Sequence, residues 1–169
     1  LNDEMITKLE NLFISPQSRM LWLAQRMFLF SFYNAGIRIG DCLSLRFSNI
    51  VEGRIDYDMS KNTKMVSGRL NQKSLDIIEQ MREIHYNEPH DYIFGLLRKE
   101  KPYFNAITIE QQRKMDIEAK TNLKSDKNTA ANQIQAALKE IAKLMGHAGH
   151  LTFHISRHSF ADKAKRMMK

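Results

Sequence analysis

The sequence contains very little cysteine, proline and glycine. Its 169 residues include one cysteine, Cys42, three prolines and seven glycines. A lone cysteine cannot form an internal disulfide bond, so we expect a reducing, cytoplasmic environment instead of a disulfide-stabilised secreted scaffold. No proline- or glycine-rich linker and no internal repeat divides the chain, and its length suits one domain with a real core.

Long hydrophobic runs are also missing. The most apolar stretch, residues 20–33 (MLWLAQRMFLFSFY), is interrupted by Gln25 and Arg26 and is too short to cross a membrane. The chain begins with Leu1 and not with a methionine, and its first residues, LNDEMITKLE, contain no basic-then-apolar export signal. We therefore expect no membrane partner, and we expect that this sequence was cut from a longer one.

The sequence has fewer acidic than basic residues. There are 26 lysines and arginines against 19 acidic residues, which gives a formal net charge of +7. Such a balance favours a polyanionic partner, with nucleic acid ahead of a membrane surface, although charge alone fits plain solubility equally well. The excess is uneven: residues 61–73 hold four basic side chains and no acid, and residues 139–169 hold seven against two acids. These stretches predict a basic face whose contacts with DNA phosphates would be sensitive to salt.

The apolar periodicity predicts a mostly helical α+β fold with one small antiparallel sheet. Alternation over 53–59 and the run 65–70 predict two strands joined by the turn 60–64 (SKNTK), and 91–94 predicts a short extended segment. Residues 99–128 are polar and fit either a loop or a fraying helix. Helices are predicted over 2–13 with Asn2 or Asp3 as N-cap, from Pro16 to the stop signal Asn34-Ala35-Gly36, over 39–45, over 72–85, from Thr129 to Gly146, and from about Thr152 to the end.

The last predicted helix has two different faces. At roughly 100° per residue, one stripe is apolar or small and faces the core; it consists of Phe153, Ser156, Phe160, Ala164 and Met167. The neighbouring stripe consists of His154, Arg157, His158 and Ala161. The planar fork of an arginine fits two phosphate oxygens, and a histidine donates a hydrogen bond or carries a proton near neutral pH. This stripe therefore suits an oxyanion such as a phosphodiester.

Two other interpretations compete for this stripe. One is an ordinary solvated basic face. The other is a metal site, because His147, His150, His154 and His158 are closely spaced and two histidines at i, i+4 can chelate zinc. The segment lacks the glutamate of an HExxH motif, no cysteine is near, and Arg157 would place a positive charge beside the ion. We expect phosphate binding and no metal.

A second arginine occurs in a predicted helix–turn–helix corner, residues 32–50 (FYNAGIRIGDCLSLRFSNI). Gly36 ends one helix, Arg38 follows in the turn, and Asp41 lies three residues later in the next helix. At that spacing, Asp41 is near enough to orient the Arg38 guanidinium. Taken alone, the motif also fits an ordinary corner with a surface arginine.

The two arginine motifs, in this order and with a basic hairpin between them, resemble the catalytic domain of the tyrosine recombinases, or phage integrases. The family's Gly-x-Arg turn with a following acid is matched by Gly36, Arg38 and Asp41, and its hairpin lysine by the turn 60–64. The family's H-x-x-R-H box is matched by HISRH, residues 154–158. The resemblance covers nearly the whole chain and implies one recombinase catalytic domain over 1–169.

The resemblance also implies roles. Arg38 and Arg157 would clamp the scissile phosphate, and His154 would help to hold it or manage protons. Asp41 would support the Arg38 region, and His158 would be structural. These assignments need no metal or other cofactor, because cationic side chains supply the charge stabilisation.

The hairpin lysine would protonate the leaving 5′ oxygen, as a mobile ammonium group can. Two lysines compete for this role. Counting back from Leu70 at the end of the returning strand favours Lys61, and Lys64 is the alternative because such turns vary in length.

The chain departs from the family pattern at its end. The family's nucleophilic tyrosine follows the box, but the five tyrosines here all precede it: Tyr33, Tyr57, Tyr86, Tyr92 and Tyr103. The segment LMGH, residues 144–147, also precedes the box and does not replace the family's Leu-Gly-His segment. We expect that the nucleophile lies beyond Lys169, that this chain is inactive alone, and that an amino-terminal DNA-clamping domain is absent.

The expected partners are double-stranded DNA and further recombinase protomers, as a tetramer on DNA in the bacterial nucleoid. A non-enzymatic helical DNA-binding module is the alternative function, and a metal-binding protein is a third.

Overall fold

The computed structural model describes residues 1–168 and has a mostly helical α+β fold with one three-stranded antiparallel sheet, as the sequence predicts. The chain forms two compact units. The helical unit comprises Leu1–Ile39 and the residues from Asn132 onward, and the sheet unit comprises Gly40–Ala131. The prediction of one catalytic domain over the whole chain stays a prediction. No helix within the described residues is long and apolar enough to cross a membrane.

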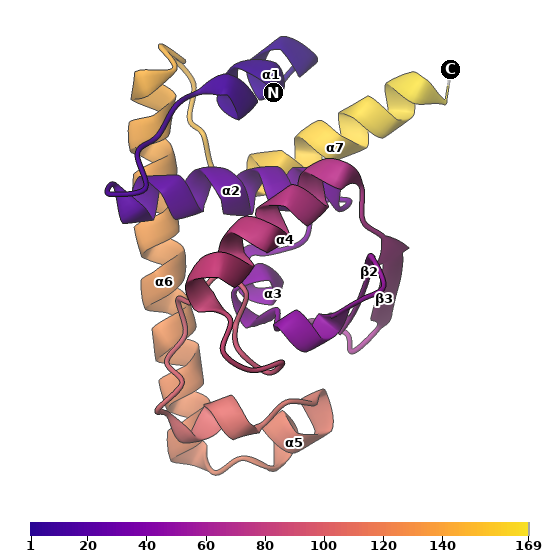
Figure 1. The fold of residues 1–169 in the computed structure, drawn as a ribbon, viewed down its shortest axis with the longest axis vertical. Helices are drawn as coiled ribbons and strands as arrows, with labels where there is room; N and C mark the ends of the chain where they lie inside the picture. The colour runs from indigo at the N-terminus through magenta and orange to yellow at the C-terminus, as the bar shows by residue number, and fades with distance from the viewer. Residues whose placement is uncertain (169) are drawn as a thin grey trace. The chain divides into compact units, whose positions relative to one another are not determined.

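The helical unit is built on α2 (Arg19–Tyr33), with α1 (Asp3–Asn11), the last part of α6 (Ile117–Leu144) and α7 (Phe153–Met167). Most of α2 is buried, including Phe28 and Phe30, because apolar side chains cover nearly its whole circumference. Helix α7 packs against α2 (Figure 1), and the rings of Phe28 and Phe153 meet edge to face at 6.4 Å.

Helix α1 is fixed to α2 by the polar residue that interrupts the apolar run. Gln25 is 4% exposed, and its amide nitrogen donates to the carbonyl oxygens of Leu9 and Leu12, at 2.8 Å each. These carbonyls belong to the C-terminal end of α1, where backbone acceptors lack partners within the helix. Gln25 therefore satisfies the end of one helix from the interior of another.

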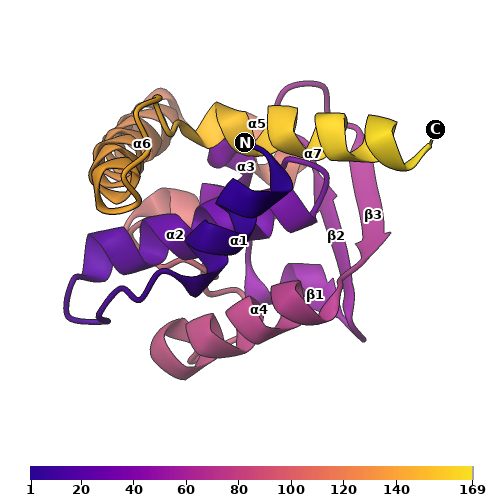
Figure 2. The same cartoon turned by 90° about the horizontal axis from the view of Figure 1, so that it is seen from above.

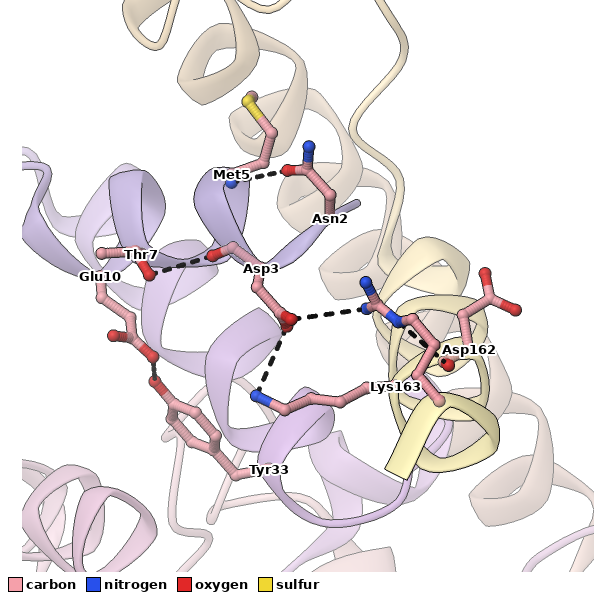
Figure 3. A network of polar contacts seen from close by, with 9 residues as sticks. Asn2, Asp3, Met5, Thr7, Glu10, Tyr33, Asp162 and Lys163 are labelled. Atoms are coloured by element: carbon pink, nitrogen blue, oxygen red, sulfur yellow. Dashed lines mark hydrogen bonds and ion pairs between the residues drawn. The ribbon is translucent and has the colours of Figure 1, made fainter. Parts of the chain in front are cut away.

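The start of α1 is held by exposed polar contacts (Figure 3). The Asn2 side chain accepts a hydrogen bond from the Met5 backbone N–H at 2.9 Å, which makes Asn2 the N-cap. The carboxylate of Asp3 lies 3.5 Å from the Lys163 ammonium and 3.7 Å from the Arg166 guanidinium of α7. Such exposed ion pairs contribute at most about 1 kcal/mol each, so burial in α2 dominates the stability of this unit.

The sheet unit contains the sheet and the elements around it. Strands β1 (Ile50–Val51), β2 (Arg54–Asp58) and β3 (Met65–Arg69) lie in the order β1-β2-β3 (Figure 2), and the β2–β3 register pairs Asp58 with Met65. The other elements are α3 (Ile39–Ser44), the 3-10 helices η1 (Phe47–Asn49) and η2 (Pro102–Asn105), α4 (Gln72–His85), α5 (Ile109–Lys114) and the first part of α6.

A buried arginine organises the long segment that follows α4. Arg46 is 3% exposed and donates to the carbonyl oxygens of His90 and Phe104, both at 2.8 Å, and to the Tyr92 hydroxyl at 3.2 Å. Its guanidinium also lies over the rings of Tyr92 and Phe104, at 4.5 and 4.9 Å. A buried cation needs partners of this kind to offset its lost hydration. The sequence-predicted extended segment 91–94 contributes one isolated bridge, between Tyr92 and Arg46.

Two predicted helix starts and one core position were wrong. Helix α2 begins at Arg19 because Pro16 lies in a turn, closed by a 2.9 Å hydrogen bond from the Ser18 N–H to the Ser15 carbonyl. Helix α6 begins at Ile117 and not at Thr129, since the Asp116 carboxylate accepts from the Ala119 N–H at 2.7 Å and caps a polar, solvent-facing first half. Met167, predicted in the core stripe, is 78% exposed.

Candidate functional site

The turn at Gly36 lies directly against α7. After α2, Ala35 and Gly36 both adopt left-handed backbone conformations, with φ of 58° and 72°, and the Gly36 N–H donates to the Ser31 carbonyl at 2.8 Å. A methyl group on Gly36 would lie 2.5 Å from Cα of Arg157 and 2.7 Å from its Cβ. Only glycine permits this approach. The turn that leads into Arg38 is therefore in direct contact with Arg157, the second arginine.

Two buried serines hold this contact in place. The Ser31 hydroxyl donates to the Ile37 carbonyl at 2.8 Å and lies 2.7 Å from the hydroxyl of Ser156. Ser156 also donates to the Phe153 carbonyl at 2.7 Å, and both serines are 0% exposed. The pair ties the turn before Arg38 to the buried face of α7. Sequence reasoning placed Ser156 on this face but missed Ser31, whose only signal is a small polar residue within an apolar helix.

The other face of α7 is polar and exposed. His154, Arg157 and His158 are all exposed, and the two histidine rings meet edge to face with their centroids 4.4 Å apart. Phe153, the first residue of α7, is buried, and its backbone N–H donates to the side-chain oxygen of Gln135 in α6 at 3.0 Å. The exposed stripe is therefore carried on a helix whose opposite face is fixed in the core of the helical unit.

Arg38 belongs to the same unit and is half-buried. It is two residues beyond Gly36, which contacts Arg157. The structure thus brings together the two segments that carry the predicted arginines, although they are far apart in the sequence.

The predicted lysine turn is a six-residue loop between β2 and β3. It is closed by hydrogen bonds of 2.9 Å from the Met59 N–H to the Lys64 carbonyl and from the Thr63 N–H to the Met59 carbonyl. The Lys64 backbone therefore extends the strand ladder. Lys61 lies in the turn itself, and the side chains of both lysines are exposed.

Asp41 anchors the beginning of this turn. It lies in α3 and is 4% exposed, and its Oδ1 accepts a hydrogen bond from the Ser60 backbone N–H at 3.0 Å. The sequence suggested that Asp41 orients Arg38. In the structure, Asp41 instead accepts its hydrogen bond from Ser60, the residue directly before Lys61. Its second oxygen, Oδ2, is buried and has no hydrogen-bond partner among the described residues.

The sheet unit also contains a cavity of about 320 Å³ beside Asp41. Its charged lining residues are Asp41, Asp56, Asp58 and Lys127. Burial lowers the pKa of the Lys127 ammonium, and the carboxylate of Asp41 partly offsets this effect by stabilising the charged form. Sequence reasoning missed Lys127, because it lies within the polar segment 99–128, for which a loop and a fraying helix were both open.

No group of three or more His, Cys, Asp or Glu side chains is placed to hold a metal ion within residues 1–168. The histidines at 147, 150, 154 and 158 therefore do not form a metal-binding cluster of that size in this structure. The exposed stripe of α7 instead offers hydrogen-bond donors and positive charge, which suit an anion.

Comparison with known proteins places this chain in a family. The model of the phage integrase family matches residues 6–167, a range that includes both arginine motifs and the lysine turn. No curated protein and no solved structure matches the chain significantly.

Proposed function

Because this chain belongs to the phage integrase family of site-specific recombinases, we propose that it is a catalytic domain that cleaves and rejoins DNA through a 3′-phosphotyrosine intermediate. The observation that carries the proposal is the contact between Gly36 and Arg157. It joins two arginine motifs separated by more than a hundred residues, and convergent arginines suit a single phosphodiester.

In the proposed reaction, the tyrosine oxygen attacks phosphorus, and the bond from phosphorus to the 5′ oxygen breaks. Negative charge grows on the non-bridging oxygens as attack proceeds. The guanidinium groups of Arg38 and Arg157 stabilise that charge, and His154 holds the phosphate or manages protons. The role proposed for His158 is to support the ring of His154, and the edge-to-face contact between the two rings, 4.4 Å between centroids, favours this role.

Lys61 donates a proton to the departing 5′ oxygen. Its place in the exposed turn leaves its ammonium mobile enough to reach a DNA strand, while the hydrogen bond between Ser60 and Asp41 fixes the start of the turn. Lys64 is the alternative acid, and its backbone is more constrained because it pairs with Met59.

The nucleophile is placed outside these 169 residues. Tyr92 and Tyr103 are buried, and the Tyr33 hydroxyl is bonded to Glu10. Burial and then the Glu10 hydrogen bond raise the pKa of Tyr33, which is unfavourable for a nucleophilic oxygen. All five tyrosines of this sequence also precede the H-x-x-R-H box, so the proposed nucleophile is a tyrosine in sequence after Lys169 or in another protomer bound to the same DNA.

Double-stranded DNA and further recombinase protomers are the proposed partners, in the cytoplasm, and no cofactor is required. Basic residues in the turn and on α7, including Lys61, Lys64 and Arg157, are exposed. Their contacts with phosphates would give affinity that falls steeply with salt and depends little on base sequence.

The test is formation of a covalent protein–DNA complex. The complete gene product is incubated with negatively supercoiled plasmid in EDTA, and the reaction is stopped with detergent. Nicked plasmid attached to protein through phosphotyrosine supports the proposal. DNA binding without an adduct supports the alternative of a non-enzymatic DNA-binding module, and stoichiometric zinc in the purified protein supports a metal-binding protein.

A further inference from the structure

The buried carboxylate of Asp41 in the sheet unit has only half of its hydrogen-bonding capacity satisfied. Oδ1 accepts from the Ser60 N–H at 3.0 Å, whereas Oδ2 is buried without a hydrogen bond. A carboxylate that is 4% exposed loses most of its hydration, and one hydrogen bond does not compensate for that loss. A positive charge nearby would offset part of that cost.

Lys127 of α6 provides a positive charge in the cavity beside Asp41. Lys127 and Asp41 line the same cavity, with Asp56 and Asp58 of β2 as the other charged lining residues. Among the described residues that line this cavity, Lys127 carries the only positive charge. It is half-buried, whereas Lys124, one turn earlier on the helix, is exposed. The electrostatic attraction acts on both partners, because Asp41 also favours the charged form of Lys127.

We propose that Lys127 is a positioning residue for the lysine turn: the positive charge of its ammonium attracts the Asp41 carboxylate across the cavity that both residues line, and Asp41 in turn holds Ser60 and the start of the loop that carries Lys61. The consequence for DNA cleavage rests on the proposed function. The structural part, protection of the Ser60 amide, does not depend on it.

Hydrogen exchange of the 169-residue chain tests the structural part without DNA. Lys127→Met should speed exchange of the Ser60 amide by roughly 5- to 30-fold, the factor that corresponds to a loss of one or two kcal/mol. Lys127→Arg retains the charge and should leave the rate near that of the wild type. Lys124→Met removes an exposed lysine from the same helix and should have no effect.

A double-mutant cycle separates the pair from a general effect on folding. Asp41→Asn removes the charge that Lys127 faces, so Lys127→Met should cause no further change in Ser60 exchange in that background. The proposal is overturned if Lys127→Met matches Lys124→Met, or if exchange rises uniformly through residues 40–131 with Ser60 no more affected than the rest. It is also overturned if Lys127→Met has its full effect in the Asp41→Asn background.

The functional part is tested with the complete gene product and a DNA duplex that carries a mapped cleavage site. Lys127→Met should slow cleavage of normal DNA, and sulfur in place of the bridging 5′ oxygen should restore the rate, because a thiolate leaves without a proton. Slow cleavage of both substrates would contradict a role through Lys61. If neither the wild type nor any variant cleaves DNA, the proposed function is wrong. The hydrogen-exchange experiment still tests the structural part independently.

Discussion

Gly36 and Arg157 are in direct contact in the helical unit. A methyl group on Gly36 would lie 2.5 Å from Cα of Arg157, and the φ of Gly36 is 72°. The glycine of the first arginine motif is therefore needed for two reasons: the turn requires a left-handed backbone, and α7 approaches too closely for any side chain. One residue thus links the positions of both arginines.

Gly36→Ala should damage activity and stability together. The left-handed backbone costs an alanine about 1–2 kcal/mol, and relief of the overlap displaces α7. We expect a lower melting temperature and a loss of adduct formation by the complete gene product. Gly40→Ala is the matched control, since a methyl group there would meet nothing within 4 Å. Equal behaviour of the two variants would show that the close approach has no functional importance.

A modified DNA substrate should distinguish the roles of the two lysines of the turn. Lys61→Ala should slow cleavage of normal DNA by about 100-fold or more, as expected for loss of a general acid. A bridging 5′ sulfur should restore most of the rate. Lys64→Ala should change cleavage less than tenfold if Lys61 is the acid, because the backbone bond by which Lys64 closes the hairpin is kept in the variant. The reverse pattern, with sulfur rescuing only Lys64→Ala, would assign the acid to Lys64.

Asp91 should make the stability of the sheet unit depend on pH. Burial alone would raise the pKa of this fully buried carboxyl, but the Lys99 ammonium at 2.5 Å and the N–H groups of Asn87 and Glu88 outweigh it and lower the pKa. A lowered pKa stabilises the folded state above the unfolded value of about 3.9, and this stabilisation disappears as pH falls through the folded value.

Urea unfolding measures this contribution. Asp91→Asn should lower the free energy of unfolding by about 1–2 kcal/mol at neutral pH, a value reduced because Lys99 is 43% exposed. The difference from wild type should shrink in acid below about pH 3.9. Asp76→Asn, an exposed change on α4, serves as the control. A difference that stays the same at both pH values would show that the charge of Asp91 contributes nothing.

The sequence predicts the parts of this fold that follow local periodicity. The alternation of Ile55, Tyr57 and Met59 marks β2, although Met59 itself lies just beyond the strand, and the buried and exposed faces of α7 follow from the spacing of Phe153 and Arg157. Glycine at position 36 also carries a local signal, as a helix stop.

Contacts between distant segments could not be predicted in the same way. The hydrogen bond from Ser60 to Asp41 depends on how the lysine turn packs against α3. The position of Lys127 beside the cavity depends on how α6 packs in the same unit. The first half of α6 lacks a strong apolar stripe because it faces solvent, so its start at Ile117 was missed. Buried Arg46 was also missed, since a cation among aromatic rings has no periodic pattern.

Arg157 provides the most direct test of the central claim, that two arginines stabilise one phosphate during cleavage. The measurement is the rate of covalent adduct formation by the complete gene product, alongside its affinity for the same DNA. Arg157→Ala should lower the rate by about 100-fold or more and weaken binding less than tenfold, and Arg157→Lys should recover only part of the rate because it lacks the planar fork. Lys165→Ala, an exposed change on the same helix, should leave the rate unchanged. Cleavage by Arg157→Ala at nearly the wild-type rate would contradict the account.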